Sequence, residues 1–123
     1  MKKIKMKKIL IIDDDPRNIF ALNATLVSKG FNCIAAQSAI QGIAFIKQAI
    51  PDIVLIDMMM PEMDGYHAMP FIKNIDPNLP IIAVTAKAMK GDRERCISSG
   101  ADEYISKPID VDKLLSIIRK FEK

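Results

Sequence analysis

The chain has 123 residues, of which half are hydrophobic and 27% are charged, and this balance excludes a disordered chain. No apolar run approaches the roughly 18 residues that a membrane-spanning helix needs, and the N-terminus lacks a signal-peptide pattern. We therefore expect one cytoplasmic domain over residues 1–123, with no membrane partner. Residues 1–7 are predicted to form a basic arm and the start of the first strand.

The net charge of +3 has a local origin, because five lysines lie within the first eight residues. From Ile9 onward the chain has 13 basic and 15 acidic residues, without a cluster of lysine and arginine. A nucleic-acid-binding surface needs such a cluster, so we expect no nucleic-acid partner. Cys33 and Cys96 match no metal or redox spacing and are predicted to be reduced thiols.

Five short aliphatic runs recur along the chain, and each is continuous rather than alternating, as in parallel strands that are buried on both faces. They are "ILII" (9–12), "CIAA" (33–36), "IVLI" (53–56), "IIAV" (81–84) and "YIS" (104–106). Helical patterns separate them. Strands that alternate with helices predict an α/β fold, a doubly wound five-stranded parallel sheet with five helices on its two faces.

Capping residues predict where the helices begin and end. Asp15 is expected to cap a helix that starts at Pro16 and ends before Gly30, with Val27 on its apolar face. A second helix follows a capping box of Ser38 and Gln41, and its predicted apolar face is Ile40, Ile43, Ala44 and Ile50. A fourth helix is predicted to end at Gly100, and a fifth to be capped by Asp110.

The third helical segment, residues 65–75, contains Pro70. Proline lacks a backbone N–H and disturbs a helix interior at a cost of about 3 kcal/mol. We therefore expect the regular helix to begin near Met69, with residues 66–68 forming a turn.

Polar residues follow the predicted strands at their carboxyl ends, where ligands bind in sheets of this kind. If the first, third, fourth and fifth strands are neighbours, these residues gather in one pocket: Asp13, Asp14, Asp57, Thr85 and Lys107. Carboxylates suit a hard cation such as Mg²⁺, whereas the lysine and the threonine suit phosphoryl oxygens. Asp15 is better explained as an N-cap than as a ligand, because Pro16 follows it.

These residues lie in the stretches "ILIIDDD", "PDIVLIDMMMPEMDG", "PIIAVTAKAM" and "GADEYISKPID". Over residues 7–121 the chain resembles the receiver domain of two-component response regulators, above all receivers associated with hybrid sensor histidine kinases. The resemblance implies the flavodoxin-like strand order 2-1-3-4-5 and a role in phosphorelay signalling. It also implies a regulatory domain rather than an enzyme, one that catalyses only its own phosphorylation and slow dephosphorylation.

The resemblance assigns roles residue by residue. Asp57 accepts the phosphoryl group from a histidine kinase or a histidine phosphotransfer protein, and an effector protein or domain responds. Mg²⁺ is held by Asp13, Asp14, Asp57 and the backbone carbonyl of Met59. Thr85 and Lys107 hold phosphoryl oxygens, Thr85 and Tyr104 form the switch, and the Lys107–Pro108 bond is expected to be cis. Met59 and Lys87 flank the path of the hydrolytic water.

Three other functions fit parts of the pattern. A flavodoxin-type FMN carrier shares the fold, but three carboxylates would repel the FMN phosphate. A phosphatase of the haloacid dehalogenase type would use Asp13 as its nucleophile, and Asp13-x-Asp15 fits its first motif although Pro16-Arg17 does not. An interaction module without phosphorylation would leave the complete pocket unexplained. The chain is expected to be a stand-alone regulator or a piece of a larger one.

Overall fold

The computed structural model describes residues 7–86 and 89–122. Its centre is a sheet of five parallel strands in the order β2-β1-β3-β4-β5, as the family resemblance implied. The strands are β1 (Lys8–Ile12), β2 (Asn32–Ala36), β3 (Ile53–Asp57), β4 (Ile81–Thr85) and β5 (Glu103–Ser106). Strands β3 and β4 are buried along their whole length, which explains why their sequences contain continuous aliphatic runs.

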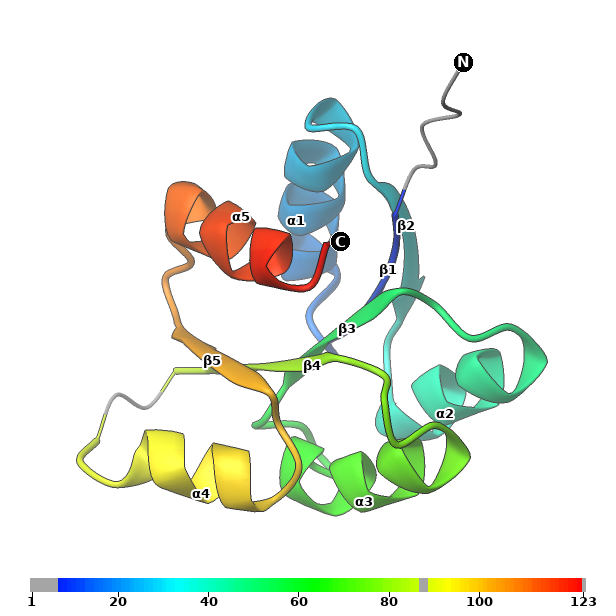
Figure 1. The fold of residues 1–123 in the computed structure, drawn as a ribbon, viewed down its shortest axis with the longest axis vertical. Coiled ribbons are helices and arrows are strands. Elements are labelled where there is room, and N and C mark those ends of the chain that lie inside the picture. The colour runs from blue at the N-terminus through cyan, green and yellow to red at the C-terminus, as the bar shows by residue number, and fades with distance from the viewer. Residues whose placement is uncertain (1–6, 87–88, 123) are drawn as a thin grey trace.

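In the described residues five helices are present, and they cover both faces of the sheet (Figure 1). They are α1 (Pro16–Ser28), α2 (Ala39–Gln48), α3 (Gly65–Ile75), α4 (Asp92–Ser98) and α5 (Val111–Lys120). Helices α1 and α5 lie on one face, whereas α2, α3 and α4 lie on the other (Figure 1). Within the described residues, no helix is long and apolar enough to cross a membrane.

Most of the predicted helix ends are present in the structure. Asp15 accepts a hydrogen bond from the Arg17 amide at the start of α1, and Gly30 follows its end with a φ of 95°. At α2, Ser38 accepts from the Gln41 amide, but the Gln41 side chain accepts from the amide of Gln37 rather than from that of the cap. The capping box is therefore only half formed.

The prediction for α3 was wrong, because the helix begins at Gly65 and Pro70 lies inside it. Asp64 caps the helix through the His67 amide, and Met69 and Ile72 are fully buried. Burying two such side chains contributes roughly 1.5–3 kcal/mol each, which outweighs the ~3 kcal/mol cost of the proline. Pro70 itself is exposed, so its ring does not compete with these side chains for space in the core.

The amino ends of β4 and β5 are joined by one charged network. The ammonium of Lys73 in α3 donates to Asp102 Oδ2 at 2.8 Å and to the Leu79 carbonyl at 2.9 Å. Asp102 Oδ2 also accepts from the Ile81 amide at 2.9 Å. A single lysine therefore ties α3 to the residues that lead into two strands, at the edge of the sheet opposite to the predicted pocket.

Candidate functional site

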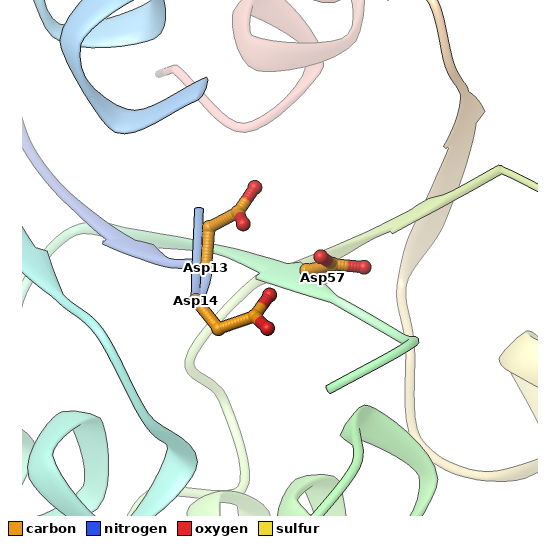
Figure 2. A group of neighbouring side chains, drawn as sticks. All are labelled: Asp13, Asp14 and Asp57. Atoms are coloured by element: carbon orange, nitrogen blue, oxygen red, sulfur yellow. The ribbon is translucent and has the colours of Figure 1, made fainter. Parts of the chain in front are cut away.

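Three carboxylates meet at the carboxyl ends of two neighbouring strands. Asp13 and Asp14 follow β1, and Asp57 is the last residue of β3, whose Ile56 is paired with Ile12. One oxygen from each carboxylate lies within 4.8 Å of the others (Figure 2). Asp13 and Asp57 are buried, whereas Asp14 is exposed. The parallel register of the sheet therefore brings together residues that are more than 40 positions apart in the chain.

The backbone and a nearby amide fix the orientation of the two buried carboxylates. Asp13 Oδ1 accepts from the Asp15 amide at 2.9 Å, and Asp13 Oδ2 accepts from Asn18 Nδ2 at 3.4 Å. Asp57 Oδ1 accepts from the Met59 amide at 3.0 Å. Each of these two carboxylates is thus oriented without a ligand. Its second oxygen faces the other carboxylates or the ammonium of Lys107.

Lys107 lies beside the acidic cluster. Its ammonium is 3.3 Å from Asp57 Oδ2 and 3.7 Å from Asp13 Oδ2. The Lys107 amide donates to the carbonyl of Thr85 at 2.7 Å, so the sheet itself places the end of β4 next to the lysine. Thr85 is 1% exposed, and the Lys107–Pro108 bond is cis, as predicted.

The electrostatics of the cluster favour the arrival of a cation. Burial raises the pKa of Asp13, and repulsion by Asp57 raises it further, whereas the Asp15 amide, Lys107 and Asn18 act in the opposite direction. One lysine faces three carboxylates, which leaves an excess of negative charge. The donors are all hard oxygen ligands, and this set fits a divalent cation such as Mg²⁺.

A cleft of about 500 Å³ opens next to the cluster, between α1 and the start of α5. Asp13, Asn18 and Lys107 lie on its polar side, and Leu22 and Ile109 on its apolar side. Asp13 and Lys107 are therefore reachable from outside by a group much larger than water.

Of the remaining predicted residues, one contacts the acidic cluster and another lies outside it. Met59 contributes its amide to Asp57, and its side chain is 49% exposed. Tyr104 is half-buried on the face covered by α4, outside the cluster. The prediction for Lys87 falls outside the described residues. Asn18 was not predicted; its place five residues after Asp13, in the first turn of a helix that follows the strand, was an available signal.

The strand order and the acidic cluster place the chain among flavodoxin-like α/β proteins. Its sequence matches the model of the response regulator receiver domain over residues 9–119. The chain belongs to this family, and it is a receiver domain of two-component signalling. The alternative of a haloacid dehalogenase-type phosphatase is not supported.

Three relatives illustrate the similarity. The chain is 32% identical over 117 residues to the polar-differentiation response regulator DivK of Brucella anthropi, covering 94% of this chain and 95% of that protein. It is 38% identical over 106 residues to the sensor histidine kinase RcsC of Salmonella typhi, covering 86% of this chain and 11% of the kinase. The receiver domain of the sensor histidine kinase PA1611 from Pseudomonas aeruginosa has been solved with magnesium coordinated in its active site cleft. That structure is similar with a TM-score of 0.87 and 32% identity, covering 95% of this chain and 98% of that one.

Receiver domains are regulatory; they interact with histidine kinases and effectors and typically use Mg²⁺. Among the residues that the structure describes, the acidic cluster has the chemistry to hold that ion.

Proposed function

We propose that this chain accepts a phosphoryl group onto Asp57 from a phosphohistidine on a histidine kinase or a histidine phosphotransfer protein. The observation that supports this assignment is the arrangement at the end of β3. The Asp57 carboxylate lies among three acidic groups and 3.3 Å from the Lys107 ammonium.

The transfer is an exchange of one bond at phosphorus. An oxygen of Asp57 forms a bond to phosphorus while the bond from phosphorus to the imidazole nitrogen breaks, and the electron pair leaves with the imidazole, which takes up a proton. The Met59 amide holds one Asp57 oxygen at 3.0 Å and so limits rotation of the carboxylate. This orientation favours attack along one direction.

The other site residues balance charge on the transferred group. The Lys107 ammonium exchanges its contact with the Asp57 carboxylate for one with a phosphoryl oxygen. The Thr85 hydroxyl donates to another phosphoryl oxygen. Asp13, Asp14, Asp57 and the Met59 carbonyl would hold Mg²⁺, which supplies further neutralisation of phosphoryl charge when bound. The switch is assigned to Thr85 and Tyr104, which lie on adjacent strands.

The proposal predicts a gain of one phosphoryl mass on incubation with a small acyl phosphate and Mg²⁺. Asp57→Asn should abolish the gain, and Asp14→Ala should weaken metal binding because one oxygen ligand is lost. Asp52→Asn is the matched control, since Asp52 lies just before β3, at the opposite end of the strand. Undiminished labelling of Asp57→Asn would refute the assignment, and label mapped to Asp13 would indicate phosphatase-like chemistry instead.

A further inference from the structure

Three consecutive methionines follow Asp57, and their side chains differ strongly in exposure. In the loop between β3 and α3, Met58 is fully buried and Met60 is 8% exposed, whereas Met59 between them is 49% exposed. Within the described residues only one methionine is more exposed, Met89 at 70%. A small reagent dissolved in water therefore reaches the Met59 side chain far more readily than the methionine on either side of it.

Met59 is also in direct contact with the proposed phosphoryl acceptor. Its amide donates to Asp57 Oδ1 at 3.0 Å. The bonds that join this amide nitrogen to the side-chain sulfur span at most about 5 Å, which places the sulfur within about 8 Å of the Asp57 oxygen. A phosphoryl group on Asp57 and one water molecule would fill most of that distance. The thioether is therefore open to solvent and within reach of the water around a phosphorylated Asp57.

An exposed thioether has a specific chemistry with peroxides, because hydrogen peroxide converts it to a sulfoxide. One peroxide oxygen forms a bond to sulfur while the O–O bond breaks, and the sulfur loses two electrons. The departing hydroxide takes up the proton of the transferred oxygen and becomes water. The product is a polar S=O group in place of a sulfur that is only a weak hydrogen-bond acceptor.

The two cysteines compete poorly for the same oxidant. Cys96 is buried and Cys33 is half-buried. Burial raises the pKa of both thiols, so little of the reactive thiolate is present at neutral pH. In the part of the chain that the structure describes, Met59 and Met89 are therefore the most accessible sulfur-containing side chains.

We propose that Met59 is a site of reversible oxidation by peroxide, and that its sulfoxide shortens the lifetime of the phosphoryl group on Asp57. This inference rests on the proposed function. Hydrolysis of an acyl phosphate needs a water molecule in line with phosphorus, and a nearby acceptor orients that water. The sulfoxide oxygen is such an acceptor, whereas the thioether is a poor one. Oxidation of a single residue would therefore weaken the phosphorylated state.

The first test locates the oxidation. The purified chain is exposed to dilute hydrogen peroxide, and peptide mass spectrometry follows the gain of one oxygen at each methionine. Met59 should be oxidised at least about fivefold faster than Met58 and Met60, which lie in the same tryptic peptide and are buried. Equal rates for these three neighbours would overturn the assignment of Met59 as the site.

The second test measures how fast the phosphoryl group is lost. Oxidised and untreated chains are freed of peroxide, labelled at Asp57 with an acyl phosphate and Mg²⁺, and followed over time without a kinase. Oxidation should make the loss about 3–10-fold faster in the wild type. In Met59→Leu, which has no sulfur at this position, oxidation should change the rate by less than about 1.5-fold, although the other methionines are still present.

Two controls exclude general damage. Met89→Leu removes the other highly exposed methionine and should respond to peroxide as the wild type does, because the Met89 carbonyl accepts from the Asp92 amide at the start of α4, outside the acidic cluster. Treatment of the oxidised wild type with methionine sulfoxide reductases, one for each sulfoxide epimer, should restore the slow loss of phosphate. A fast rate that persisted after complete reduction of Met59 would contradict the proposal.

The outcomes separate this inference from the proposed function. If the Met59 sulfoxide forms and the loss of phosphate is unchanged, control by oxidation is refuted while phosphorylation of Asp57 stands. If oxidised Met59→Leu loses phosphate as fast as the oxidised wild type, another residue is responsible and the assignment to Met59 is refuted too. If untreated wild type takes no phosphoryl group at Asp57, the proposed function fails and this inference fails with it.

Discussion

The two faces of the sheet contain different kinds of side chain. On the face covered by α1 and α5, the buried cluster is almost wholly aliphatic and includes Leu26, Leu114, Ile117 and Ile118. On the face covered by α2, α3 and α4, three buried methionines lie beside Cys96 and the partly buried Tyr66 and Tyr104.

The face covered by α1 and α5 is therefore suited to stabilising the fold, and the face covered by α2, α3 and α4 to small conformational changes. Branched aliphatic side chains interlock in few rotamers, whereas methionine adapts its shape, and hydroxyl groups can exchange hydrogen-bond partners. The difference implies that substitutions on the α1/α5 face act mainly on the free energy of unfolding. Substitutions on the α2/α3/α4 face should act more on the site.

The largest expected effect is on the aliphatic face. Leu114 is fully buried, so Leu114→Ala should lower the free energy of unfolding by about 2–5 kcal/mol, through lost burial and the cavity left behind. Urea unfolding measures this. Ile40→Ala is the control, because Ile40 is 62% exposed and its truncation should cost no more than about 0.5 kcal/mol. A similar cost for the two variants would contradict the role of this face.

A smaller loss of stability is expected on the other face. In Gly65→Ala, the added Cβ would lie 2.4 Å from the Met58 sulfur and 2.9 Å from the Met58 Cα. The thioether can move but the backbone cannot, so we expect a cost of about 1–3 kcal/mol.

The same substitution should also affect the site, because Met58 is covalently bonded to Asp57. Gly65→Ala should slow acyl phosphate labelling of Asp57 more than Leu114→Ala does, in spite of its smaller effect on unfolding. The reverse order of labelling rates would mean that the two faces do not differ in this respect.

At the carboxyl edge of the sheet, Met59 should control how long the phosphoryl group remains on Asp57. Met59 offers no strong acceptor for the proton of a hydrolytic water, and its side chain is half exposed. Met59→Asn supplies a polar group that can orient water, so loss of phosphate from Asp57 should become about 3–10-fold faster. Time courses in excess Mg²⁺ without kinase measure the rate. Met89→Asn, a change at another exposed methionine, is the control. Equal decay of Met59→Asn and wild type would rule out control of the water by this side chain.

The smallest effect concerns an ion pair that links β5 to α5. Lys120 Nζ lies 2.6 Å from Glu103 Oε2, and this contact lowers the pKa of Glu103 below its usual 4.5. Stability from the pair is therefore present above pH 4.5 and is lost as the pH falls through the lowered pKa.

Because Lys120 is largely exposed, Glu103→Gln should cost only about 0.5 kcal/mol at pH 7, and the difference from wild type should vanish in acid. Urea unfolding at several pH values checks both statements. Glu122→Gln, near the end of the same helix, should show no such pH dependence. A difference that persisted in acid would point to packing rather than charge.

The sheet and the acidic cluster were predictable because they depend on short, local patterns. Continuous aliphatic runs indicate buried parallel strands, and residues that follow such strands necessarily meet at one edge. Asp13 and Asp57 are therefore placed together by topology, although they are far apart in the chain. Asp15 was also assigned correctly, because capping is decided within a few residues.

Packing of the helices was harder to predict. The buried residues of α2 are Ala39, Gly42 and Ile46, whereas the predicted Ile40 is exposed. A Cβ on Gly42 would lie 2.5 Å from Ile12, so the absence of a side chain sets how closely α2 approaches β1. Hydrophobic periodicity gives glycine little weight and therefore selects the wrong face.

The hydrogen bond from the Tyr66 hydroxyl of α3 to Asp92 at the start of α4 could not be anticipated for a different reason. Tyr66 and Asp92 are 26 residues apart, and neither belongs to a motif that names its partner. Their contact depends on the angle at which α4 meets α3. Local sequence signals do not determine that angle.

The Lys73 network has a mechanical consequence for the strands it joins. Lys73 of α3 is bound to the residues that lead into β4 and β5, and Thr85 and Lys107 lie at or just beyond the carboxyl ends of these strands. The pairing of β4 with β5 continues from this end to Thr85 and Ser106, so a change at the amino ends is passed along the paired residues. Lys73→Met should therefore make the amino ends of β4 and β5 more mobile. The positions of Thr85 and Lys107 should become less well fixed as a result, although the substituted residue lies at the far edge of the sheet.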